Sequence, residues 1–213
     1  MFRDREQAGR ALAEKVRPHV QDKKPLILAL PRGGVPVAFE IARSLGADVD
    51  VFLVRKLGFP GQEELAIGAI ASGGVRVLNE DLIAESGLSR KLVDEVTARE
   101  QTELDRRAAM YRQGRPAIPV AGRTIVLVDD GLATGASMLA AARALRPQGA
   151  ERIIIAVPVA PIQSCEDLER EVDQVICAET PEPFVAVGAW YEDFAQVTDE
   201  QVRKLLDGAS AKN

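Results

Sequence analysis

The sequence predicts an α/β protein with a doubly wound, mostly parallel sheet and a small hood or helical insertion. Continuous apolar runs at residues 26–30 and 125–128 are typical of strands that are buried on both faces. Such runs alternate with segments in which apolar residues recur at helical spacing, as they do over 35–45. Strands that alternate with helices indicate a parallel sheet covered by helices on both sides.

The first part of the chain is expected to hold two helices and four strands. The predicted elements are a helix at 5–20, a strand at 26–30, a helix at 35–45 and strands at 49–54, 65–71 and 75–78. Ala8, Leu12 and Val16 recur near helical spacing in the first helix. Gly73-Gly74 favours a turn, so it is expected to join the last two strands.

The second part opens with a polar segment at 89–113 that is rich in Glu, Arg and Lys. We expect a solvated, salt-bridged helix there, either in a hood over the site or at a subunit contact of a homodimer. The elements that follow are a strand at 125–128, a helix at 138–146, strands at 153–157 and 175–178, and a short helix near 199–206. The whole chain, 1–213, is expected to be one domain, with a loop, hood and helical insertion at about 58–115.

Composition argues against several classes of protein. The chain has 213 residues, of which 46% are hydrophobic and 28% are charged, as in ordinary globular proteins. A net charge of −5 and an aromatic content of 4% argue against nucleic acid as a partner, because a basic face and base-stacking platforms are lacking. No apolar run is long enough to cross a membrane, and the charged start does not resemble a signal peptide, so a cytoplasmic protein is expected.

The inventory of reactive side chains excludes several kinds of catalysis. Cys165 and Cys177 form no metal-ligand pattern and are expected to be reduced thiols. The single histidine, His19, leaves no other imidazole for a Ser-His-Asp triad, and no His/Cys cluster suits zinc. The sequence also lacks a Gly-x-x-x-x-Gly-Lys-Ser/Thr loop, which argues against a nucleotide hydrolase.

The stretch 124–137 carries the strongest chemical signal. An apolar run ends in Asp129 and Asp130, and a small-residue loop with hydroxyls at Thr134 and Ser137 leads into an Ala-rich helix. Free backbone N–H groups and the helix dipole make such a helix start an anion site. The acids cannot bind a phosphate, so we expect them to face sugar hydroxyls or a hard cation. A phosphate beside a diol has the shape of a ribose phosphate.

This order of strand, diacid, hydroxyl loop and helix resembles the signature of the type I phosphoribosyltransferases. The resemblance implies that Asp129 and Asp130 hold the ribose 2′- and 3′-hydroxyls of 5-phosphoribosyl-1-diphosphate. The loop that would wrap the 5′-phosphate consists of Gly131, Leu132, Ala133, Thr134, Gly135, Ala136 and Ser137. An ordinary hairpin turn or solvated loop around Asp-Asp-Gly is the alternative.

A second element, Pro31-Arg-Gly-Gly, follows the first predicted strand. Gly33 and Gly34 allow a tight turn and close approach to a ligand, and Arg32 supplies paired donors suited to phosphate. Loops at the carboxyl ends of neighbouring strands share one crevice in a doubly wound sheet. Similar enzymes bind diphosphate here, often with a cis peptide, which we look for at Pro31–Arg32. An ordinary strand–helix turn is the alternative.

A third element, Arg55-Lys56, is expected at the carboxyl end of the second strand. The resemblance implies that Lys56 and Arg55 contact the diphosphate, although a solvated basic pair explains them as well. Gly58, Pro60 and Gly61 suggest an irregular loop after this strand. In similar enzymes such a loop closes over the site and excludes water.

A fourth element, residues 184–194, resembles the base-binding end of the purine-type enzymes. Phe184, Trp190 and Tyr191 are candidates for stacking on a base, and core packing is the alternative for each of them. The segment departs from the purine pattern around Trp190 and lacks a Lys before Val185 that would read an exocyclic oxygen. The identity of the acceptor is therefore left open.

Taken with the residues, the resemblance implies a Mg²⁺-dependent glycosyl transfer from 5-phosphoribosyl-1-diphosphate to a nucleobase-like acceptor. Arg32 and Lys56 would hold the diphosphate, while Asp129 and Asp130 would reach the metal indirectly, through ribose or water. No residue is an obvious general base, and a carboxylate such as Asp130 is the candidate left open. Two alternatives stay open: a regulatory module that binds ribosyl diphosphate without transfer, and a phosphatase or ribose-phosphate-processing enzyme that uses the same pocket without a base.

Overall fold

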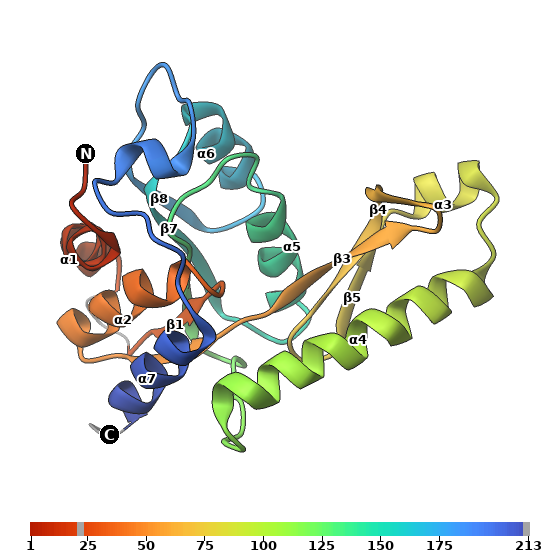
Figure 1. The fold of residues 1–213 in the computed structure, drawn as a ribbon, viewed down its shortest axis with the longest axis horizontal. Helices are drawn as coiled ribbons and strands as arrows, with labels where there is room; N and C mark the ends of the chain where they lie inside the picture. The colour runs from red at the N-terminus through yellow and green to blue at the C-terminus, as the bar shows by residue number, and fades with distance from the viewer. Residues whose placement is uncertain (21–23, 211–213) are drawn as a thin grey trace.

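The computed structural model describes residues 1–20 and 24–210 and confirms the α/β class, with an arm projecting from a layered body (Figure 1). The central sheet has the order β2-β1-β6-β7-β8, and all of its neighbouring strands pair in parallel. Its strands are β1 (Leu26–Ala29), β2 (Asp48–Val51), β6 (Thr124–Val128), β7 (Arg152–Val159) and β8 (Gln174–Glu179).

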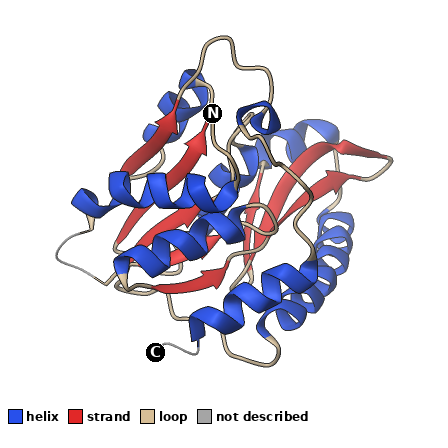
Figure 2. Cartoon of the chain, turned by 60° about the vertical axis from the view of Figure 1, so that its left-hand side comes forward, coloured by secondary structure: helices blue, strands red, loops and turns tan. Residues whose placement is uncertain are grey.

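Helices cover both faces of this sheet, as Figures 1 and 2 show. On one face lie α1 (Arg5–Val16), α2 (Gly34–Leu45) and α7 (Asp199–Ser210), and on the other lie α5 (Ala136–Leu145) and α6 (Ile162–Glu169). Alternate residues of each strand serve the two cores: Val126 and Val128 face the first group of helices, while Ile125 and Leu127 face the second. Because β6 is buried along its whole length, the acids that follow it start from a fixed position.

The arm contains a second sheet, which is antiparallel with the order β3-β4-β5. The strands of this sheet are β3 (Val54–Phe59), β4 (Gln62–Ala71) and β5 (Val75–Leu78). The arm also contains the helices α3 (Glu80–Ser86) and α4 (Arg90–Arg112). The expected strands at 65–71 and 75–78 and the helix at 89–113 are therefore confirmed. The helices α3 and α6 were not anticipated, although Asn79 caps α3 by accepting a bond from the Leu82 amide at 3.1 Å.

Two predictions about the second strand are wrong. The strand expected at 49–54 ends at Val51, and the chain then enters the antiparallel sheet at Val54. The irregular loop expected after Lys56 is instead the β3–β4 hairpin, which turns at Pro60-Gly61. Cross-strand pairing satisfies the backbone groups that an irregular loop would have left to solvent.

The expected thiol state is also wrong for this structure. Cys165 on α6 and Cys177 on β8 form a disulfide. The two cysteines are 12 residues apart in the sequence, a spacing that is not typical of metal ligands and does not indicate a disulfide. The packing of α6 along β8 brings their side chains together. Among the described helices, none is both long enough and apolar enough to span a bilayer.

The end of α4 is fastened to the body through the buried acid Asp50. Arg112 donates from Nε to both Asp50 carboxylate oxygens at 3.0 Å and from a terminal nitrogen to the Val51 carbonyl at 2.8 Å. The two side chains are 13% and 8% exposed, so solvent screens the pair only weakly. The Ile118 amide also donates to Asp50.

We expect Arg112→Met to lower the free energy of unfolding by about 3 kcal/mol, because it leaves a buried carboxylate without its cation. Arg106→Met on the same helix is the control, because Arg106 forms an exposed ion pair with Glu103. Denaturant titration of the variants measures the difference. Equal unfolding midpoints for the two variants would show that the Asp50 pair does not hold the arm to the body.

Candidate functional site

The loops after β1 and β6 meet at the carboxyl edge of the central sheet, where the strand order reverses. The peptide bond Pro31–Arg32 is cis, as the sequence led us to look for. A β-carbon at Gly33 would overlap the Asp130 carboxylate, and one at Gly34 would lie 2.9 Å from the Asp129 Cα. Gly33 is therefore required by contact with Asp130 and Gly34 by contact with Val128 and Asp129, and the predicted common crevice is confirmed.

Asp129 is held inside this crevice by its neighbour. Its Oδ1 accepts a bond from the Asp130 amide at 2.8 Å. Burial, followed by the negative charge of Asp130, raises the pKa of Asp129 well above its ordinary value, and the charge of Arg5 opposes this rise. Because the folded-state pKa is raised, the contribution of Asp129 to stability is full at low pH. It is lost as the pH rises through the raised pKa.

Asp130 is held by residues from both ends of the chain. Arg5 at the start of α1 donates to Asp130 Oδ2 at 2.8 Å, and the Tyr191 hydroxyl donates to the Asp130 carbonyl at 2.6 Å. Burial and the charge of Asp130 raise the pKa of Tyr191, so its hydroxyl stays a donor. Sequence reasoning missed Arg5, because nothing in its local sequence indicates a partner 125 residues away.

The loop after the diacid is anchored at its hydrophobic residue. Leu132 is buried, and its amide donates to the Val159 carbonyl at 2.9 Å, so this N–H is not available to a phosphate. Gly135 occupies the N-cap of α5 with φ 72°, a left-handed conformation that favours glycine. Thr134 and Ser137 are exposed, and the first turn of α5 leaves amide groups without partners inside the helix.

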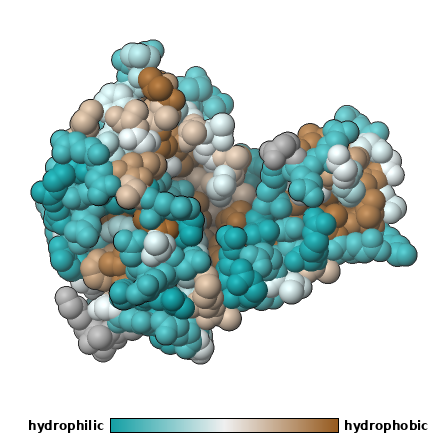
Figure 3. Space-filling view, viewed as in Figure 1, coloured by the Kyte–Doolittle hydropathy of each residue, from teal (hydrophilic) through white to brown (hydrophobic). Residues whose placement is uncertain are grey.

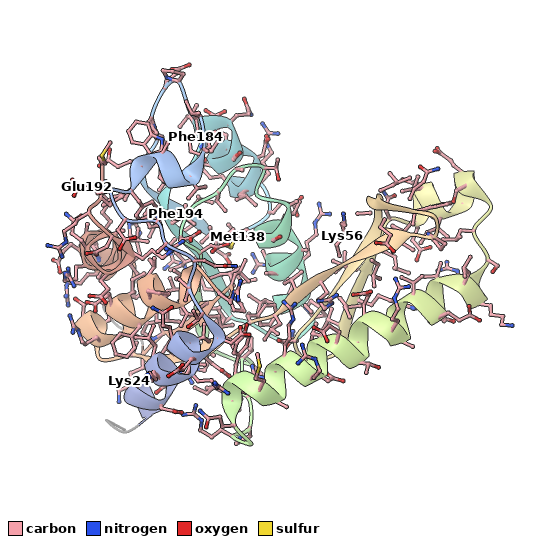
Figure 4. All side chains as sticks on the ribbon, viewed as in Figure 1. Lys24, Lys56, Met138, Phe184, Glu192 and Phe194 are labelled. Carbon is pink, nitrogen blue, oxygen red and sulfur yellow. A yellow bond between two sulfur atoms is a disulfide. The ribbon has the colours of Figure 1, made fainter. Side chains whose placement is uncertain are left out.

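The predicted cations are divided between two cavities. Arg32 lines a cavity of about 350 Å³ with Asp130 and Arg5. Lys56 lines a larger one of about 670 Å³ with Ser137, in the notch between α5 and the arm (Figures 3 and 4). The structure therefore brings Arg32, but not Lys56, into the cavity that Asp130 lines.

Arg55 is engaged within the arm rather than at the crevice. Its Nε donates to Glu100 Oε2 at 2.7 Å. Burial acts to raise the pKa of Glu100, but bonds from Arg55 and Arg99 outweigh it and lower that pKa overall. The diphosphate contacts assigned to Arg55 and Lys56 stay predictions.

The three aromatic residues proposed for the base differ in exposure. Tyr191 is buried and supports Asp130, with its ring 5.0 Å from that of Phe194. Trp190 and Phe184 are half-buried, and Phe184, which follows β8, lies above Phe194 in the view of Figure 4. Phe194, which sequence reasoning did not single out, is 37% exposed and lines the cavity with Arg32. Base stacking by Phe184, Trp190 or Tyr191 stays a prediction.

Comparison with known proteins agrees with this geometry. The profile of the phosphoribosyl transferase domain family matches residues 2–192. The chain belongs to this family. A protein of Mycobacterium tuberculosis H37Rv named "Putative phosphoribosyl transferase" is 46% identical over 209 residues, which are 98% of this chain and 47% of the relative. The chain thus spans about half the length of the curated relatives it matches.

Two further relatives extend the comparison. The crystal structure of TT1426 from Thermus thermophilus is 44% identical, covers 97% of both chains and superposes with a TM-score of 0.86. A Methanopyrus kandleri protein named ribose-phosphate pyrophosphokinase is 34% identical over 137 residues, which are 55% of this chain and 47% of that protein. The type I phosphoribosyltransferase fold expected from the diacid signature is confirmed.

We expect Gly33→Ala to displace the Asp130 carboxylate, because the added carbon would occupy its place. Overpacking of this kind costs about 1–3 kcal/mol of unfolding free energy. Gly208→Ala is the control, since its nearest neighbour would be 3.9 Å away and α7 should gain helix propensity. Calorimetry with ribose 5-phosphate should show weaker binding only for Gly33→Ala. Unchanged affinity in both variants would contradict the close contact between the two loops.

Proposed function

We propose that this protein transfers the 5-phosphoribosyl group from 5-phosphoribosyl-1-diphosphate to a nitrogenous, nucleobase-like acceptor and releases diphosphate. The observation that carries the proposal is the diacid Asp129-Asp130 at the β1/β6 junction, between the glycine turn and the start of α5. Family membership supports the same reaction class. The acceptor itself is not specified by these residues.

We assign each part of the substrate to residues of the loops that follow β1 and β6. Carboxylates accept hydrogen bonds from a diol, so Asp129 and Asp130 suit the ribose hydroxyls. The amides at the start of α5, with Thr134 and Ser137, suit the 5′-phosphate. Arg32 suits the diphosphate, since its side chain is 37% exposed and its guanidinium lies 3.8 Å from Asp199, beyond hydrogen-bond distance.

In the proposed reaction, the bond between ribose C1 and the diphosphate oxygen breaks, and the diphosphate leaves with both electrons. The acceptor nitrogen forms the new bond to C1 from its lone pair, and its proton passes to solvent. The protein contributes orientation of the diol and electrostatic stabilisation of the leaving group by Arg32. Asp130 is poorly suited to take the proton, because Arg5 already engages its Oδ2.

We propose Mg²⁺ as the cofactor. Within the described residues, no group of three or more His, Cys, Asp or Glu side chains could hold a metal. Two adjacent carboxylates fit a Mg²⁺ ion that keeps several waters and is bound mainly by substrate phosphates. Asp129 and Asp130 would hold it indirectly, and it would supply neutralisation of the diphosphate charge. Homodimer formation is likewise still a prediction.

A second candidate is a ribose-phosphate-processing enzyme that uses no acceptor base. The likeness to the Methanopyrus kandleri protein named ribose-phosphate pyrophosphokinase favours it. Mass analysis of the products separates the two reactions, because only transfer gives a ribosylated acceptor. A regulatory module without transfer would give no product at all.

We expect Asp129→Asn and Asp130→Asn each to lower the rate of transfer on the order of 100-fold, because each removes a preorganised charge beside the ribose. The measurement is diphosphate release with ribosyl diphosphate, Mg²⁺ and a panel of bases. Asp167→Asn is the control, since Asp167 is exposed on α6. Wild-type turnover by both diacid variants at saturating substrate would refute the proposed function.

Calorimetry should detect weak binding of Mg²⁺ to the protein alone and tighter binding when ribosyl diphosphate is present. The physical reason is that two carboxylates without further protein ligands do not displace the hydration shell of Mg²⁺. Asp129→Asn should weaken the binding of Mg²⁺ in the presence of ribosyl diphosphate. Tight binding of Mg²⁺ to the protein alone would contradict the indirect role of the diacid.

A further inference from the structure

The ion pair between Arg5 and Asp130 is nearly buried. The two side chains are 11% and 15% exposed, and Arg5 Nε lies 2.8 Å from Asp130 Oδ2. An exposed ion pair contributes little to stability, but removing one partner of a buried pair leaves an uncompensated charge and is strongly unfavourable. The site acid that faces the ribose in the proposed function therefore has a dedicated protein cation.

Arg5 is itself fixed from two further directions. A terminal nitrogen donates to the Ala195 carbonyl at 2.8 Å, and the guanidinium carbon lies 3.9 Å from the centre of the Phe194 ring. A guanidinium over an aromatic face gains a cation–π attraction. Together with the bond from Nε to Asp130, these contacts fix the orientation of the planar guanidinium of Arg5.

The segment before Arg5 is also tied to the crevice. The Phe2 amide donates to the Trp190 carbonyl at 2.8 Å, and the Glu192 amide donates to the Phe2 carbonyl at 2.9 Å. Asp4 then caps α1 by accepting a bond from the Gln7 amide at 2.7 Å. Backbone pairing and a helix cap thus set the position from which Arg5 reaches Asp130.

We propose that Arg5 is a positioning residue of the ribose site, an inference that rests on the proposed function. By holding Oδ2, Arg5 fixes the rotamer of Asp130 and presents Oδ1 to a ribose hydroxyl. Charge-assisted hydrogen bonds of this kind are short and directional. The adjacent Asp129 would otherwise repel Asp130, and the Arg5 charge offsets that repulsion at no cost in reorganisation when ligand binds.

The inference requires that Arg5 affects recognition of the diol but not of the phosphate. We expect Arg5→Gln to weaken ribose 5-phosphate binding by roughly 10–100-fold. Removing a residue that orients a metal ligand by a hydrogen bond lowers metal affinity or activity by a similar factor. Binding of inorganic phosphate should not change. Arg5→Lys should recover part of the loss, and Arg3→Gln, which removes an exposed charge beside Asp4, is the matched control.

A double-mutant cycle with Asp130→Asn tests whether the effect passes through Asp130. In that background, Arg5→Gln should cause no further loss of ribose 5-phosphate affinity. If Arg5→Gln fails to fold, Phe194→Leu replaces it: removing the ring beneath the guanidinium should produce a smaller loss with the same ligand selectivity.

The outcomes separate this inference from the proposed function. The positioning role would be overturned if Arg5→Gln lowered the affinities for ribose 5-phosphate and inorganic phosphate equally. It would also be overturned if the losses of affinity caused by Arg5→Gln and Asp130→Asn multiplied in the double variant. A wild-type protein that binds ribose 5-phosphate no better than inorganic phosphate would refute the ribose site itself and the inference with it. Selective binding without transfer would refute only the proposed reaction.

Discussion

Two adjacent carboxylates at the end of a fully buried strand impose the constraint on which the rest of the site depends. Burial, followed by repulsion from the charge of Asp130, raises the pKa of Asp129. The Arg5 guanidinium offsets part of this repulsion by donating to Asp130 Oδ2, while the Tyr191 hydroxyl, near the other end of the chain, donates to the Asp130 backbone carbonyl. The turn after β1 needs Gly33 because the Asp130 carboxylate occupies the space of a side chain.

Basic residues of the body and of the arm line different cavities. Arg32, on the loop after β1 of the parallel sheet, lines the same cavity as Asp130, whereas Lys56 belongs to the antiparallel sheet and lines the notch. The position of the arm depends on buried polar contacts of α4. Arg112 engages Asp50, and the Tyr111 hydroxyl donates to Asp199 at 2.7 Å.

Sequence patterns predicted the regular parts of the fold because those parts follow local periodicity. The buried strands β1 and β6 have continuous apolar runs, and α2 and α4 have helical spacing or composition. The patterns failed where pairing between strands decides the conformation. The hairpin after Lys56 contains Gly58, Pro60 and Gly61, which resemble an irregular loop until β4 supplies the missing backbone partners.

The sequence by itself determined the diacid, the small-residue loop and the glycine turn, because each is a contiguous motif whose chemistry is local. Only the tertiary structure decided which cations and rings join them. Arg5 and Phe194 enter the site, Tyr191 becomes a buried support and Arg55 turns to Glu100. These outcomes depend on contacts between segments up to 190 residues apart, such as that from Arg5 to Ala195, which no local pattern encodes.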